Sequence, residues 1–126
     1  MKKNAFTLIE LLAILVILSI LSVILVPTVN DSIKKARESS YESQVNTILS
    51  SAENYIMNSD FKVENDEKVI YVKDIVSSGY LDTMLTNPLT KKKMIGCVGI
   101  KSYSNQYHYH YIDDEKECEK YKKIDE

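Results

Sequence analysis

A run of twenty residues without a charged side chain, Leu11 to Asn30, constrains this chain more than any other feature. As an α-helix the run is about 30 Å long, at roughly 1.5 Å per residue, which matches the hydrocarbon core of a bilayer. One carboxylate, Glu10, stands at its front. An acidic side chain at the centre of a membrane helix costs at least about 2.5 kcal/mol, and somewhat less near an end, so it usually has a partner or a task. The run predicts a membrane helix, and Glu10 is the residue whose partner must be found.

The composition of the rest of the chain fits one small polar domain. The membrane segment takes part of the 126 residues and leaves about ninety-five for a head outside the bilayer. The 16 Lys and Arg residues nearly balance the 18 Asp and Glu residues, and the longest basic block is 91–93. Nucleic-acid binding needs a stronger positive surface, so we expect no direct nucleic-acid partner. Lys2 and Lys3 precede the apolar run and are expected to stay in the cytoplasm, which puts the head outside.

A secretory signal peptide is one alternative for such an N-terminus. It would need an apolar stretch of about 7 to 15 residues followed by a small-residue cleavage site. The apolar region here is longer, has Glu10 near its front, and is not followed by an Ala-x-Ala-like site after Val26. The one small-residue junction, Ala5–Phe6, comes before the apolar run. A cut there would remove residues 1–5 and leave the hydrophobic segment as the new N-terminus.

The string at residues 5–12, Ala-Phe-Thr-Leu-Ile-Glu-Leu-Leu, follows a short leader with two lysines. It resembles the processing and methylation signature of type IV prepilins and type II secretion pseudopilins, and the resemblance covers about the first thirty residues. In that family a membrane-embedded aspartyl peptidase cuts before the phenylalanine and methylates the new amine, which corresponds to the Ala5–Phe6 bond and to Phe6. Two positions differ from the family pattern: Ala5 replaces the usual glycine before the cut, and Ser19 replaces a glycine common in major pilins.

The resemblance also implies a role for Glu10, because the family's acidic residue falls at this position and its helix proline falls at Pro27. Cleavage would create an ammonium at Phe6, and burying that charge in lipid is costly unless a carboxylate lies beside it. Glu10 is one helical turn away, so it could neutralise its own amine or that of a neighbouring copy. In the family the second arrangement sets the axial stagger of a helical filament. The alternative is an acidic residue without a task near the membrane boundary.

By this resemblance the chain is expected to be a structural subunit, a pilin or pseudopilin, of a type IV pilus-like or type II secretion filament. Its partners would be the prepilin peptidase, other pilin subunits, an assembly platform membrane protein and the cytoplasmic membrane, from which it would pass into an extracellular filament. Major, minor and competence pilins and secretion pseudopilins are all open, and the short head and Ala5 slightly favour a minor pilin or a pseudopilin.

Two other functional classes are alternatives to the filament subunit. One is a single-pass membrane-anchored binding protein or adhesin that does not polymerise. The other is a secreted enzyme, which would need residues 1 to about 26 to be removed. No phosphate-binding glycine loop, nucleophile elbow or zinc spacing occurs in the sequence, so we expect no catalytic residue and no cofactor.

The apolar pattern becomes amphipathic after Pro27 and predicts a single helix from Phe6 to Asn58. The face expected to pack has apolar residues at spacings near three and four: Ile33, Ala36, Tyr41, Val45, Ile48, Leu49, Ala52, Tyr55 and Ile56. The opposite face is polar: Lys34, Lys35, Arg37, Glu38, Glu42, Gln44 and Asn46. A free-standing coiled coil is the alternative, but the apolar positions do not hold a clean seven-residue repeat.

Pro27 is expected to bend this helix rather than end it. Its ring removes a backbone donor and clashes with the carbonyl of Val23, which membrane helices tolerate when nearby groups compensate. The hydroxyl groups that could compensate are those of Ser19, Ser22 and Thr28. The expected organisation is a leader at 1–5, a hydrophobic helix at 6–30, the amphipathic half of the same helix at 31–58, and a head at 59–126.

The head is expected to be a small antiparallel sheet packed on the amphipathic half of the helix, an α+β arrangement similar to pilin heads. The strand-like runs, rich in β-branched or aromatic residues, are 69–72, 94–103 and 106–112. Ser104-Asn105 predicts a hairpin turn between the last two. A short helix is expected over 72–81 with Gly79 near its C-cap, followed by a turn at Asn87-Pro88.

The two cysteines, Cys97 and Cys118, both belong to the head, which is expected to lie outside the cytoplasm. A disulfide can persist there, and closing a loop of this length would stabilise a small domain by about 3 kcal/mol in the chain-entropy description. The bond resembles the C-terminal disulfide loop of many pilins. Two free thiols are the alternative if the environment is reducing.

His108 and His110 alternate with tyrosines, so on a strand both would lie on the same face. Metal binding by this pair is one interpretation. Two ligands do not complete a metal site and the sequence has no third histidine, so we expect a solvated strand face and no metal.

Overall fold

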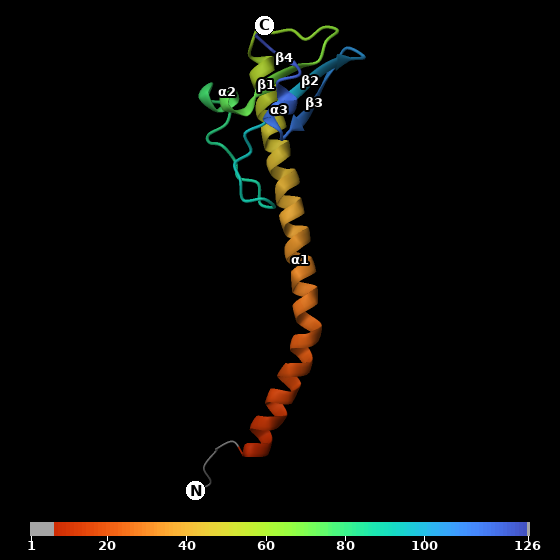
Figure 1. The fold of residues 1–126 in the computed structure, drawn as a ribbon, viewed down its shortest axis with the longest axis vertical. Helices are drawn as coiled ribbons and strands as arrows, with labels where there is room; N and C mark the ends of the chain where they lie inside the picture. The colour runs from red at the N-terminus through yellow and green to blue at the C-terminus, as the bar shows by residue number, and fades with distance from the viewer. Residues whose placement is uncertain (1–6, 126) are drawn as a thin grey trace. The chain divides into compact units, whose positions relative to one another are not determined.

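Residues 7–125 are described by a computed structural model, in which the chain forms two compact units, one ending at Arg37 and the other beginning at Glu38. Helix α1, Leu8–Met57, is uninterrupted over its 50 residues (Figure 1). The prediction of one long helix is confirmed, and its end lies one residue before the expected Asn58. The expected start at Phe6 lies outside the described residues.

The first unit is the part of α1 that carries Pro27, and the helix continues through this residue. The nearby hydroxyls donate to carbonyl oxygens four residues earlier: Ser19 to Leu15 at 2.7 Å, Ser22 to Leu18 at 2.7 Å and Thr28 to Ile24 at 3.2 Å. Each hydroxyl is therefore satisfied within the helix, as an apolar environment requires. None of the three donates to the carbonyl of Val23, so the expected compensation for Pro27 does not come from them.

The second unit holds a four-stranded sheet in the order β3-β2-β1-β4. Its strands are β1 Lys68–Tyr71, β2 Cys97–Tyr103, β3 Gln106–Ile112 and β4 Lys122–Lys123. The first three pair antiparallel, as expected, but β4 pairs parallel with β1, so the sheet is mixed. The chain reaches β4 through helix α3, Glu115–Cys118, which carries it from β3 across to the far edge of β1. Two exposed lysines give no alternating apolar pattern, and this explains why the sequence did not predict β4.

The predicted turns are confirmed by their backbone geometry. Ser104 and Asn105 both have left-handed φ values, 55° and 60°, which form the tight two-residue loop that joins β2 to β3. Helix α2, Val72–Ser77, is followed by its C-cap Ser78 and then by Gly79 with φ 85°, and the amide of Tyr80 donates to the carbonyl of Ile75 at 3.2 Å. This is a Schellman ending, for which glycine is the favoured residue.

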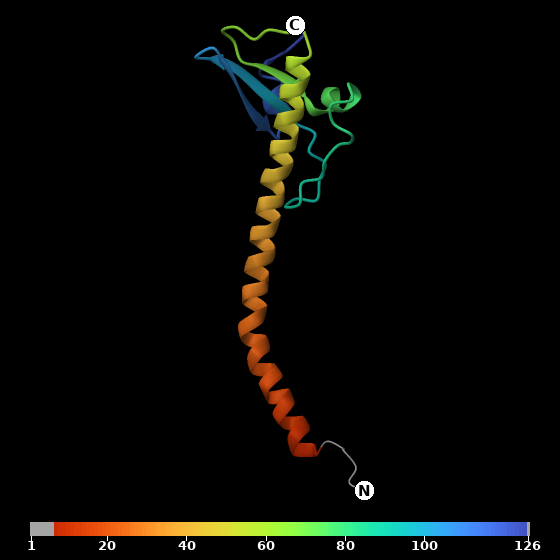
Figure 2. The same cartoon turned by 180° about the vertical axis from the view of Figure 1, so that it is seen from behind.

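The main core lies between α1 and one face of the sheet. Helix α1 contributes Ile48, Ala52 and Ile56, and the sheet contributes Ile70, Val98 and Ile100. The β2–β3 hairpin and α2 lie on opposite sides of this part of α1 (Figures 1 and 2). The prediction that the second half of α1 packs on the sheet is confirmed.

The packing face of α1 is shorter than expected. It begins at Tyr41, while Ile33 and Ala36 are exposed. It also includes Ser51, which is buried although its residue type did not suggest a core position, because its hydroxyl donates to the Thr47 carbonyl at 2.9 Å.

A second, smaller core covers the other face of the sheet. It consists of Val69, Tyr71, Cys97, Ile112 and Cys118. The disulfide between Cys97 and Cys118 is present, with a Cα–Cα distance of 6.1 Å, and it attaches α3 to strand β2. Packing in the two cores removes apolar side chains from water. This stabilises the folded state by about 1.5–3 kcal/mol for each fully buried aliphatic side chain.

Candidate functional site

The first turn of α1 is organised by two side chains. Leu8 is the first helical residue, so Thr7 is the N-cap and Glu10 is the third residue of the helix. The backbone N–H of Glu10 donates to the hydroxyl of Thr7 at 3.2 Å, and the backbone N–H of Thr7 donates to the Oε2 of Glu10 at 3.3 Å. This reciprocal pair is a capping box, which satisfies two amides that a helix N-terminus otherwise leaves free.

This use of Glu10 was not predicted from the sequence, although Thr-x-x-Glu before an apolar run is a recognisable capping signal. The carboxylate also lies at the positive end of the helix dipole, where a negative charge is stabilised. The expected processing and methylation positions, Ala5 and Phe6, lie outside the described residues. Glu10 is thus placed on its own helix end, and its expected pairing with a Phe6 amine stays a prediction.

The part of α1 that follows Glu10 exposes an unbroken apolar surface. Val23 is 75% exposed and Ile24 is 61% exposed, and none of residues 11–37 is buried. Monomeric soluble proteins rarely expose apolar patches beyond a few hundred Å². By length and composition α1 is able to cross a membrane, and within residues 7–125 it is the one helix of that kind. A secretory signal sequence can have the same length and apolar composition. The sequence before the helix therefore has to distinguish a membrane anchor from a secretory signal.

The two histidines lie on the exposed outer face of the β2–β3 hairpin, and each has a partner. The Nε2 of His110 is 3.0 Å from the Oε1 of Glu67, while the ring of His108 lies 4.7 Å from the ring of Tyr103. Gly99 makes room for the first pair, because a Cβ there would be 2.7 Å from both the Glu67 oxygen and the His110 Nε2. Among the described residues no group of three metal-binding side chains comes together.

The tyrosines of β3 point to the other face, toward α1. Burial raises the pKa of Tyr111, and the hydrogen bond from its hydroxyl to Asp113 at 3.0 Å raises it further. Burial also raises the pKa values of Tyr41 and Tyr109. These hydroxyls therefore stay protonated at neutral pH and act as neutral donors rather than as bases.

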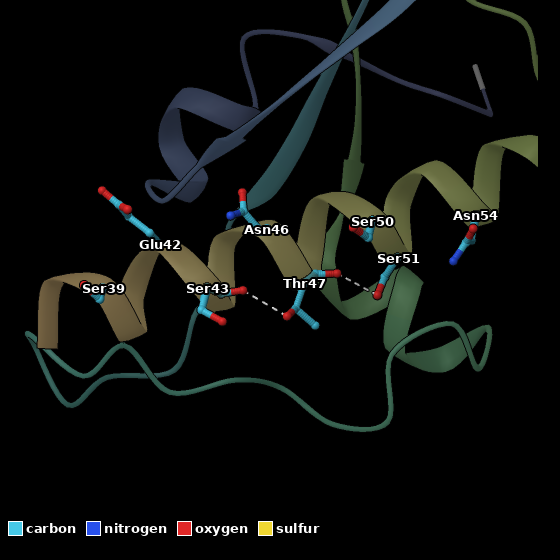
Figure 3. Close-up of a pocket in the computed structure, with 8 residues that line it drawn as sticks. All are labelled: Ser39, Glu42, Ser43, Asn46, Thr47, Ser50, Ser51 and Asn54. Carbon is cyan, nitrogen blue, oxygen red and sulfur yellow. Dashed lines mark hydrogen bonds between the residues drawn. The ribbon is translucent and has the colours of Figure 1, made fainter. Parts of the chain in front are cut away.

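A shallow polar groove runs along one side of α1 in the second unit (Figure 3). Its lining comes entirely from this helix: Ser39, Glu42, Ser43, Asn46, Thr47, Ser50, Ser51 and Asn54. Thr47 and Ser51 donate to the carbonyls of Ser43 and Thr47, each at 2.9 Å, so these hydroxyls are engaged with their own backbone. Neither of these hydrogen bonds joins a hydroxyl to a base, which the activation of a nucleophilic serine requires. The groove is a small-residue helix face, suited to close approach of another surface.

The comparison with known protein families identifies one segment. Residues 1–26 match a family model described as the prokaryotic N-terminal methylation motif, which is the signature of type IV pilins and pseudopilins. This match covers the expected processing site, Glu10 and most of the uncharged run. No curated protein and no solved structure matches the chain.

Proposed function

We propose that this chain is a pilin-like or pseudopilin structural subunit that is cut at the Ala5–Phe6 bond, methylated at Phe6 and assembled into a filament through helix α1. The observation that carries the proposal is the exposed apolar part of α1, which begins next to the carboxylate of Glu10 and lies mostly within the matched methylation motif at residues 1–26. An exposed surface of this kind needs lipid before assembly and other copies of the helix after it. One helix thereby serves as membrane anchor and as assembly surface.

Cleavage would place a new ammonium at Phe6, close to the carboxylate of Glu10. In the free chain this carboxylate accepts a hydrogen bond from the Thr7 amide, and its other oxygen, Oε1, has no partner among the described residues. One oxygen can thus hold the helix end while the other accepts the amine of an adjacent copy. Because an unpaired charge in an apolar environment is costly, this pairing would favour one axial stagger over others.

The remaining expectations follow from this proposal. The prepilin peptidase would act at the membrane, an assembly platform protein would extract the subunit, and other pilin subunits would cover the apolar face. The cytoplasmic membrane would hold the subunit until then, with the head outside. The disulfide of the head requires an oxidising compartment, which supports that orientation.

A non-polymerising adhesin or anchored binding protein is the second candidate. The observation that favours it is an exposed aromatic pair at the tip of the β2–β3 hairpin, where Tyr103 is 62% exposed beside the ring of His108. Aromatic surfaces of this kind contact sugars and proteins. The same pair is compatible with a filament subunit, so it does not separate the two candidates.

The test combines the mass of the chain with imaging of the cell surface. The filament proposal expects a mass equal to Phe6–Glu126 plus one methyl group, together with filaments labelled by an antibody to the head. A mature mass without filaments would favour the anchored binding protein. Retention of residues 1–5 in cells with an active prepilin peptidase would overturn the proposal.

A further inference from the structure

A notch on the second unit is lined by two tyrosines and bordered by two carboxylates. Tyr41, Glu42, Val45 and Asn46 of α1 and Tyr111 of β3 enclose a volume of about 260 Å³. Most ligand pockets have roughly 300–1,000 Å³, so this notch is suited to one inserted side chain rather than to a whole small molecule. We call it the tyrosine notch.

The charges around the tyrosine notch are negative. Glu42 lines it, and Asp113 accepts the hydrogen bond from the Tyr111 hydroxyl. Neither carboxylate has an ion-pair partner among residues 7–125. Lys92 and Lys93 line a separate hollow with Asp113 but form no ion pair with it. Aromatic rings and free carboxylates together attract a cation, so the occupant should carry a positive charge.

We propose that the tyrosine notch binds the guanidinium of Arg37 from a second copy of this chain, an inference that rests on the filament function proposed above. Arg37 is the one arginine in the sequence, and its side chain is exposed. A planar guanidinium can stack on a tyrosine ring while it donates two hydrogen bonds to a carboxylate, which a lysine ammonium cannot do.

The register proposed for the filament brings these groups to the same level. Pairing of the Phe6 amine with Glu10 of another copy offsets two parallel helices by four residues, about 6 Å. Arg37 and Tyr41 are also four residues apart, and α1 is continuous through both. The same offset therefore sets Arg37 of one copy level along the helix axis with Tyr41 of the next, a residue that lines the notch.

The test uses charge-reversal variants in cells that assemble the native chain. Arg37→Glu and Glu42→Arg should each reduce surface filaments by about tenfold or more, because each leaves like charges in contact. Leader removal, membrane level and the melting temperature of the head should stay at native values. The matched controls are Lys35→Glu and Glu38→Arg, which make the same charge changes at exposed positions outside the notch, and both should assemble like the native chain.

Mixing the two variants identifies the contact as one between copies. Co-expression of the Arg37→Glu chain with the Glu42→Arg chain should restore filaments, because alternating copies then place opposite charges together at every contact. Rescue by the double variant alone, without rescue by co-expression, would indicate a pair within one chain and overturn the inference. Native assembly of Arg37→Glu, or equal loss in the controls, would also overturn it. If Glu42→Arg fails to assemble while Arg37→Glu assembles normally, the notch binds a group on a different protein rather than Arg37 of a second copy, and the inference is overturned. Absence of filaments from the native chain would instead refute the proposed function and this contact with it.

Discussion

Thr7 and Glu10 cap the first turn of α1 reciprocally, each backbone amide donating to the other residue's side chain. The carboxylate proposed to bind an amine on another copy is therefore already fixed in direction by its own helix. This arrangement lowers the entropy lost when a neighbour binds, since the side chain is ordered beforehand. It also means that replacing Glu10 removes both a helix cap and a charge, and the two effects must be separated.

Glu10→Gln separates them. Glutamine can keep the capping box but carries no charge, so the helix end should stay intact while the pairing with a Phe6 amine is lost. We expect normal leader removal and membrane insertion but few filaments, measured by intact mass and by antibody imaging. Thr7→Val makes the complementary change, since it removes the cap hydroxyl at a cost of about 1 kcal/mol and keeps the charge. Assembly should survive Thr7→Val better than Glu10→Gln, and the reverse order would show that the cap matters more than the charge.

Removing the disulfide should destabilise the head. In the double variant Cys97→Ala with Cys118→Ala, we expect the free energy of unfolding to fall by about 3 kcal/mol, because the unfolded chain regains the freedom of the closed loop. Denaturant unfolding of the head measures this loss, and reduction of the native protein provides a control without substitution. Hydrogen exchange should rise most in α3 and β4, since the disulfide attaches this segment to β2. Uniform exchange across the head would contradict the local role.

Two glycines, Gly96 just before β2 and Gly99 within it, should differ sharply in their tolerance to substitution by alanine. A Cβ at Gly96 would overlap the backbone carbonyl of Ile112, which cannot move without breaking the second core. A Cβ at Gly99 would meet only the side chains of His110 and Glu67, which can rotate away. We expect Gly96→Ala to cost about 3 kcal/mol or more, and Gly99→Ala about 1 kcal/mol or less. Equal melting temperatures for the two variants would contradict this steric explanation.

The sequence predicted the elements whose signals are local. The long helix, the hairpin turn at Ser104-Asn105 and the Gly79 helix ending follow from apolar length, turn residues and capping residues, and all three are present. Strand β4 depends instead on where α3 and the disulfide carry the chain, which two lysines do not encode. The tyrosine notch was also beyond prediction, because its two tyrosines are far apart in the sequence and meet only when β3 packs on α1.

Alkaline pH should destabilise the head through three of its partly buried tyrosines. The folded state raises the pKa values of Tyr41, Tyr109 and Tyr111, chiefly by burial, whereas in the unfolded chain each returns to about 10. Below that value both states are protonated and the stability is unaffected by pH. Above it the unfolded chain loses protons that the folded head retains, so the free energy of unfolding falls as the pH rises.

Tyr111→Phe tests this explanation. The variant should lose about 1 kcal/mol at neutral pH, because the hydrogen bond to Asp113 disappears. It should also lose less stability than the native head between about pH 9 and about pH 11, because one of the three titrating groups is gone. Urea unfolding at several pH values measures both effects. Tyr103→Phe is the matched control for the loss of a hydroxyl, since Tyr103 is 62% exposed, and it should keep the stability of the native head at neutral pH. Parallel curves for the native head and Tyr111→Phe would show that the alkaline loss arises from other groups.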